Sequence, residues 1–144
     1  MAWKGRDIPG ILCGASCLVG IVLAVLGNAA GAAYTLNEAG VRFTARGQYQ
    51  EAATAFEQAL RLQPGDPVIR RNYARLKTVL GHGWLAGGQT ERAREAYAAA
   101  IELSPEEASA FLGLGDVQLR LRDARAATES YRRALALEPS SAAG

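Results

Sequence analysis

Apolar residues recur at helical spacing in three related stretches of the chain. Each stretch carries an alanine, an aromatic residue four positions later, a second alanine three positions after that, then two aliphatic residues and a proline. The copies occupy residues 52–64, 93–105 and 127–139. Positions i, i+4 and i+7 lie on one face of a helix, so the alanines and the aromatic residue share a face. The pattern therefore predicts three related helices, each ended by a proline that cannot donate a helical N–H.

The spacing of the three copies gives the length of the repeat unit. Pro105 and Pro139 are 34 residues apart, whereas Pro64 and Pro105 are 41 apart, which is 34 plus 7. This period, with these residues at these offsets, resembles the tetratricopeptide repeat over roughly residues 33–139. The resemblance implies a first helix in each unit with a glycine and, three residues later, an aromatic residue. The matching stretches are Ala39-Gly40-x-x-Phe43, Leu80-Gly81-x-x-Trp84 and Leu114-Gly115-x-x-Gln118. In the third stretch Gln118 replaces the aromatic residue, so we expect looser packing there.

The resemblance implies an all-α solenoid of six antiparallel helices in three repeats. The repeats fall at about 33–66, 67–107 and 108–139, and residues 140–144 form a frayed tail. Seven additional residues, 67–73, amount to about two helical turns, so they lengthen one first helix without rotating its core face. The expected helices are Leu36–Arg46, Tyr49–Leu62, Pro67–Ala86, a helix that follows Thr90 as its cap, Pro105–Leu121, and a last one after Asp123 that ends at Glu138.

Glycine and capping residues mark the expected helix ends. Gly47 tolerates the left-handed conformation that ends many helices, and Gly87-Gly88 breaks the long one. Asp66-Pro67 is a cap followed by a favoured first helical residue. Further predicted caps are Thr90, Asp123 and a capping box at Ser104-Pro105-Glu106-Glu107.

The longest uncharged stretch, Ile8 to Ala33, precedes the repeats. Its 26 residues exceed the ~20 that cross a hydrocarbon core, so it predicts a single transmembrane anchor within residues 1–33, ahead of a repeat domain at 34–139. A cleaved signal peptide is the alternative, because Ala30-Gly31-Ala32 resembles a processing site. Lys4 and Arg6 favour a cytoplasmic N-terminus. That orientation places the repeats on the periplasmic side of a bacterial inner membrane.

Small residues recur within this apolar segment at a spacing of four. Such a strip lets a second transmembrane helix approach closely. Chance occurrence in an alanine- and glycine-rich chain is the alternative. The residues are Gly10, Gly14, Ser16, Gly20, Ala24, Gly27 and Gly31.

The family resemblance also implies a function, because tetratricopeptide arrays bind protein segments on the concave face lined by their first helices. Members that bind chaperone tails hold a terminal carboxylate with Lys, Asn and Arg. The matching positions here are Asn37, Val41, Ser109 and Gly113, so such a tail is disfavoured. The twelve groove positions carried over from the family are Tyr34, Asn37, Val41, Thr44, Arg75, Thr78, His82, Leu85, Ser109, Leu112, Asp116 and Leu119.

Charge and reactive residues narrow the function further. With 16 basic and 14 acidic residues the net charge is only +2, so nothing indicates a nucleic-acid partner. His82 is the only histidine, and Cys13 and Cys17 lie in the apolar segment without further ligands. We therefore expect no enzymatic activity, metal or cofactor. A basic set on the long helix is either a solvated face or a contact to acidic lipid or protein; it comprises Arg70, Arg71, Arg75 and Lys77.

The last helix has no predicted neighbour on its outer side. Solenoids usually end in a polar helix that covers the last repeat, and no such helix is predicted here. We therefore expect Ala126, Leu135 or Leu137 to be partly exposed. Three hypotheses follow. The chain is a membrane-anchored scaffold, accessory subunit or assembly factor for protein partners in a membrane complex; or it self-associates into rings or filaments; or it is a cleaved periplasmic binding module.

Overall fold

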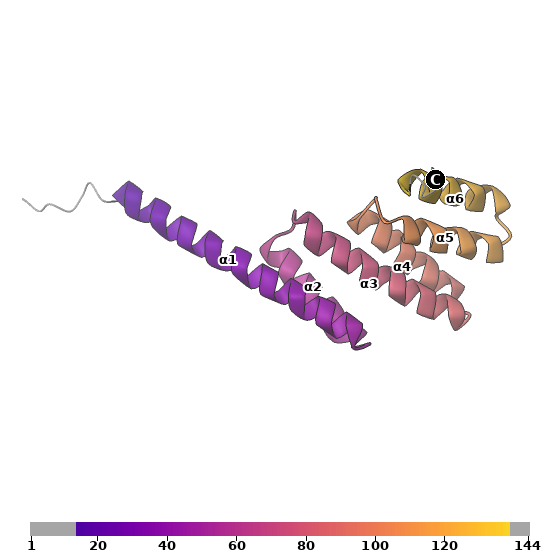
Figure 1. Cartoon of the computed structure of the whole chain (residues 1–144), viewed down its shortest axis with the longest axis horizontal. Helices are drawn as coiled ribbons and strands as arrows, with labels where there is room; N and C mark the ends of the chain where they lie inside the picture. The colour runs from indigo at the N-terminus through magenta and orange to yellow at the C-terminus, as the bar shows by residue number, and fades with distance from the viewer. Residues whose placement is uncertain (1–13, 139–144) are drawn as a thin grey trace, which may run out of the picture.

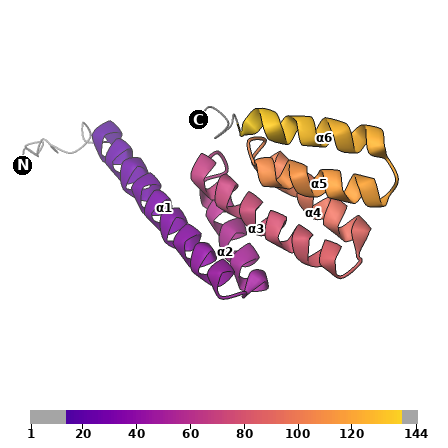
Figure 2. The same ribbon diagram turned by 45° about the vertical axis from the view of Figure 1, so that its right-hand side comes forward.

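The computed structural model of the chain is all-α and describes residues 14–138, with side chains described from residue 27 onward. Successive helices run back and forth and pack as three pairs, which stack side by side (Figures 1 and 2). The seven-residue insertion was predicted to lengthen the first helix of the second repeat by two turns. This prediction is confirmed, because that helix runs over 20 residues, Pro67–Ala86. The helices are α1 (Gly14–Ala45), α2 (Tyr49–Leu62), α3 (Pro67–Ala86), α4 (Thr90–Leu103), α5 (Ala108–Arg120) and α6 (Ala124–Leu137).

Helix α1 runs without a break from the apolar segment into the first repeat. Its first half stands clear of the other helices (Figure 1). Among its side chains from residue 27 onward, the first buried one is that of Ala33. The predicted start of this helix at Leu36 is therefore wrong. The physical reason is that no proline occurs between Pro9 and Pro64, so nothing in the chain ends the helix after the apolar segment.

The predicted membrane span, Ile8–Ala33, lies mainly outside the described side chains. In the part of the chain that was described in full, residues 27–138, no helix is long and apolar enough to cross a membrane. Gly27 and Gly31 of the small-residue strip have open space beside them. The other strip residues, both cysteines and the tail at 140–144 lie outside the fully described residues.

Two of the predicted helix caps are present and two are not. Asp66 accepts hydrogen bonds from the N–H groups of Val68 (2.8 Å) and Ile69 (3.0 Å), and Asp123 accepts one from Ala126 (3.0 Å). Thr90 is instead the first residue of α4, whose preceding residue makes no side-chain cap.

The predicted capping box at Ser104–Glu107 is also wrong. Ser104 ends α4, and its carbonyl accepts the Glu107 N–H at 3.1 Å in a turn between the helices. Helix α5 consequently begins at Ala108 rather than at Pro105. These residues form a tight turn between the repeats, so Ser104 is not at the start of α5.

The turn inside each repeat uses one residue with positive φ. This residue is Gly47 (φ 73°), Gly88 (φ 75°) and, in the third repeat, Arg122 (φ 63°). The three turns share the same backbone hydrogen bonds, including Gly47 N–H to the Thr44 carbonyl at 3.0 Å. Glycine adopts this conformation freely, whereas a side chain makes it costly.

Replacing Arg122 by glycine is therefore expected to stabilise the protein, by about 0.5–1 kcal/mol. Urea denaturation of the full chain in mild detergent, followed by circular dichroism, measures the change. Arg122→Ala is the matched control, because it removes the same charge but keeps a Cβ in the left-handed conformation. An equal gain in both variants would show that the charge, and not the backbone, matters.

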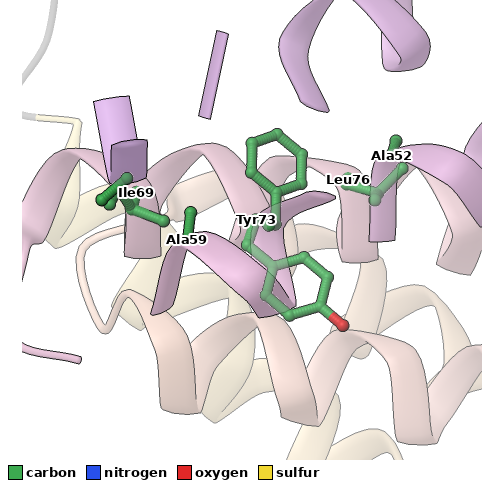
Figure 3. Packing of buried hydrophobic residues seen from close by; sticks show 7 residues of the cluster. Ala52, Ala59, Ile69, Tyr73 and Leu76 are labelled. Carbon is green, nitrogen blue, oxygen red and sulfur yellow. The ribbon is translucent and has the colours of Figure 1, made fainter. Parts of the chain in front are cut away.

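The core lies between the paired helices and is built from alanines and aromatic rings. Phe56 of α2 stacks on Tyr73 of α3 with ring centroids 5.6 Å apart. The Tyr73 hydroxyl reaches outward and donates to Glu57 Oε1 at 2.8 Å. Figure 3 shows Tyr73 among the buried residues Ala59, Ile69 and Leu76. The shared aromatic position thus joins one repeat to the next, as the periodic pattern predicted.

The third repeat replaces one aromatic contact of the core by a polar one. Gln118 stands where the second repeat has Trp84, and its Oε1 accepts a hydrogen bond from the buried Ser130 hydroxyl at 2.7 Å. The glutamine expected to loosen this repeat is therefore held to the opposing helix α6.

Candidate protein-binding groove

The first helices of the repeats are α1, α3 and α5. Helix α3 lies between the other two and contacts both, so the three line one side of the solenoid. Each begins at the same end, so residues at matching repeat positions lie beside each other across the three helices. Of the twelve predicted groove residues, nine are exposed or half-buried: Tyr34, Val41, Thr44, Arg75, His82, Ser109, Leu112, Asp116 and Leu119.

The other three predicted groove residues are buried and occupied within the fold. Asn37 Oδ1 accepts a hydrogen bond from Asn72 Nδ2 at 3.0 Å, which joins α1 to α3. The Thr78 hydroxyl donates to the Ala74 carbonyl of its own helix at 3.1 Å. Leu85 packs in the core beside Tyr97. These three side chains are therefore used within the fold and do not face a partner.

Two tyrosine hydroxyls from the second helices reach the groove and hold its polar residues. Tyr97 Oη lies 2.8 Å from His82 Nδ1, and Tyr131 donates to Asp116 Oδ1 at 2.6 Å. Both pairs are 15 residues apart. In the first repeat the same positions hold Val41 and a phenylalanine, so an apolar residue replaces the polar one where the hydroxyl is missing.

These pairs were not predicted from the sequence. The signal was present, because tyrosine accompanies a polar residue and phenylalanine an apolar one at one fixed spacing. The groove therefore changes in character along its length. The position paired with the aromatic residue holds a valine in the first repeat, a histidine in the second and a carboxylate in the third.

The Asp116 carboxylate influences the pKa of two tyrosines at the groove. Burial, and then the negative charge of Asp116, raises the pKa of Tyr97 above its ordinary value. The hydrogen bond to Asp116, with burial and the same charge, raises the pKa of Tyr131. Both hydroxyls thus stay protonated at neutral pH and are available as donors to the groove residues.

A shallow cavity of about 530 Å³ lies at the first-repeat end of the groove, between α1 and α3. Tyr34, which is 63% exposed, lies in its wall, and its hydroxyl donates to Glu38 Oε1 at 2.8 Å. The cavity is open to one side and large enough for a single side chain of a partner. Its lining residues are Tyr34, Asn37, Glu38, Val41, Arg42 and Asn72.

The four predicted patch cations do not form one surface. Arg70 donates to the carbonyls of Leu103 and Glu102 at 2.9 Å, and so closes the end of α4. The Lys77 ammonium lies 4.8 Å from the centre of the Tyr73 ring. Two cations remain on the exposed side: Arg71, and Arg75, which is 3.7 Å from Glu107.

The outer side of α6 carries an exposed leucine. Leu135 is 72% exposed, whereas its repeat equivalents, Leu60 and Ile101, are half-buried against the next repeat. Leu137 and Ala126, the other two residues expected there, are half-buried. Among helices α1–α6, none covers this side of α6.

This architecture defines a helical-repeat interaction protein. Tetratricopeptide-repeat family models match residues 43–83 and 79–142, so the chain belongs to the tetratricopeptide-repeat family. Domains of this family are protein–protein interaction modules that bind peptide partners and are typically non-catalytic. Within residues 27–138 no group of three or more His, Cys, Asp or Glu residues could hold a metal ion.

Solved structures show the same fold. The first tetratricopeptide domain of Spaghetti (RPAP3), bound to the HSP90 peptide SRMEEVD, is 23% identical with a TM-score of 0.51 and covers 77% of this chain and 82% of its own. The second Spaghetti domain, bound to the same peptide, is 20% identical with a TM-score of 0.52, and the match covers 80% of this chain and 99% of that domain. The Arabidopsis OM64 tetratricopeptide domain is 21% identical with a TM-score of 0.52, and the match covers 77% of this chain and 86% of that domain.

Proposed function

We propose that this protein is a membrane-anchored scaffold, accessory subunit or assembly factor that holds a protein partner of a membrane complex in its groove. The observation that carries the proposal is the continuity of α1. The same helix bears the uncharged segment at its start and groove residues such as Tyr34 and Val41 near its end. An anchor joined in this way holds the groove in a fixed orientation near the bilayer.

Several features of the chain support a membrane anchor. Residues 8–33 carry no charge, and the described start of α1 stands apart from the repeats (Figure 2). Cleavage before Ala33, the alternative, would fall inside α1 next to a buried residue. Lys4 and Arg6 favour an inside N-terminus, so we place the repeats in the periplasm of a bacterium, on a single-pass inner-membrane protein.

The partner we propose differs from a chaperone tail. The Spaghetti domains bind an acidic HSP90 peptide, whereas the corresponding clamp positions here lack Lys and Arg. Asn37 is already bonded to Asn72, and Gly113 lies against the Tyr97 ring. The groove therefore offers no cations for a terminal carboxylate at those positions.

The proposal is tested by extracting the tagged full chain from its own membranes in mild detergent and weighing the complexes by native mass spectrometry. We expect an intact chain from Met1, resistant to carbonate extraction and bound to unlike subunits. A mature chain that starts near Ala33 and is recovered without membranes would instead support a periplasmic binding module.

A second candidate, self-association, rests on the outer side of α6. Leu135 is exposed where both preceding repeats cover the equivalent residue. A copy stacked there would form a head-to-tail contact that closes into a ring or grows as a filament. Leu135→Glu distinguishes this candidate, because it would dissolve such oligomers and leave binding in the groove unchanged.

A further inference from the structure

We infer that the third-repeat end of the groove binds a basic side chain, lysine or arginine, of the partner segment, with apolar side chains of that segment on either side. The inference rests on the proposed groove function and names the kind of partner it takes. The site is built on Asp116, the only acidic residue among the twelve groove positions.

The exposed face of α5 has the matching arrangement of apolar and acidic residues. Leu112, Asp116 and Leu119 are spaced i, i+4 and i+7, so they lie on one face of the helix. The two leucines are 41% and 50% exposed, although such large side chains are more often buried. The carboxylate thus stands between two apolar contacts, each one turn away.

The charge of Asp116 has no counter-ion within residues 27–138. Arg120, one turn along the same helix, donates instead to the Leu85 carbonyl at 3.2 Å. Arg75, the groove cation on α3, is 3.7 Å from Glu107. Arg120 and Arg75 are therefore both engaged elsewhere, and the carboxylate is left for a ligand.

The carboxylate is also held in place before a ligand arrives. Tyr131 donates to its Oδ1 at 2.6 Å, and the Tyr131 ring packs against Gly115 of the same helix α5. A held side chain loses less conformational entropy on binding. An acidic partner residue at this point would meet like charge, so the same group that attracts a cation disfavours an acidic segment.

The first test selects ligands from a phage-displayed library of random 12-residue peptides, using the full chain in mild detergent. We expect the bound pool to be enriched in peptides with Lys or Arg flanked by leucine, isoleucine or aromatic residues. Selection on Asp116→Asn should lose this enrichment. Asparagine can still accept the Tyr131 hydroxyl, so the variant removes the charge and keeps the contact.

The second test measures one enriched peptide, and its version with the basic residue changed to Gln, by fluorescence anisotropy. Removing the charge from either side should weaken binding about three- to tenfold. Removing both should cost little more than removing one. Glu95→Gln, an exposed acid on α4, is the matched control and should leave the affinity unchanged.

The outcomes separate this inference from the proposed function. Leu112→Ser and Leu119→Ser report whether any selected peptide occupies the groove. Peptides that are weakened by these changes but carry no basic residue, or ignore Asp116→Asn, would leave the groove function standing and overturn the inference. No enriched peptide, or none sensitive to either leucine, would overturn both.

Discussion

Replacing Tyr97 by alanine should lower the free energy of unfolding by about 3–5 kcal/mol, the usual range for a large buried aromatic residue. Tyr97 is 0% exposed, and its ring is close to glycines of two different first helices. A Cβ built on Gly81 of α3 would lie 2.6 Å from the ring, and one on Gly113 of α5 would lie 2.2 Å from it. Losing the ring therefore opens a cavity shared by the second and third repeats.

Urea denaturation of the full chain in mild detergent measures this loss, with Trp84 fluorescence and circular dichroism as two signals. Trp84 packs against the cluster that contains Tyr97, so its emission follows the same region. Tyr97→Phe is the control. It keeps the ring and removes only the contact to His82, so we expect about 0.5–1.5 kcal/mol. If the alanine variant does not fold, Tyr97→Leu should show an intermediate loss, and a loss below about 1 kcal/mol would contradict a central role for the ring.

Most of the fold could be predicted from the repeat pattern in the sequence. The predicted bounds of α2 and α3 agree with the structure to the residue, because proline, glycine and a capping aspartate mark their ends. These local signals act through the backbone, independently of packing. The start of α1 could not be predicted, because no such residue separates the apolar segment from the first repeat.

The groove was predicted less completely than the fold. Family register identifies the side of each first helix, but not how deeply a side chain lies. Thr78 satisfies its hydroxyl on its own helix and is buried, whereas His82, one turn later, is exposed. The hydrogen bonds of Tyr97 and Tyr131 depend on how the two helices of a repeat face each other. These hydrogen bonds could therefore not be predicted without the packing of the two helices.

Two glycines of the same helix, Gly81 and Gly83, should respond oppositely to substitution by alanine. A Cβ at Gly81 would lie 2.6 Å from Tyr97 Cε1, while a Cβ at Gly83 would have nothing within 4 Å. Overpacking a filled core costs about 1–3 kcal/mol, which exceeds the helix propensity of up to ~1 kcal/mol that alanine gains over glycine. Gly81→Ala should therefore destabilise the protein, and Gly83→Ala should stabilise it by up to about 1 kcal/mol. The same urea titration measures both.

A double substitution identifies the ring as the cause. In a Tyr97→Leu background the Gly81 methyl group would meet a smaller side chain, so Gly81→Ala should cost clearly less there than in the wild type. The effect of Gly83→Ala should be the same in both backgrounds, since distant sites add independently. Equal costs of Gly81→Ala in the two backgrounds would mean that the Tyr97 ring is not what excludes a side chain at position 81. A smaller cost in the Tyr97→Leu background would show that the glycine of the first helix and the aromatic residue of the second form one packing unit. The same unit occurs in the other two repeats, where Gly40 lies against Phe56 and Gly115 against Tyr131.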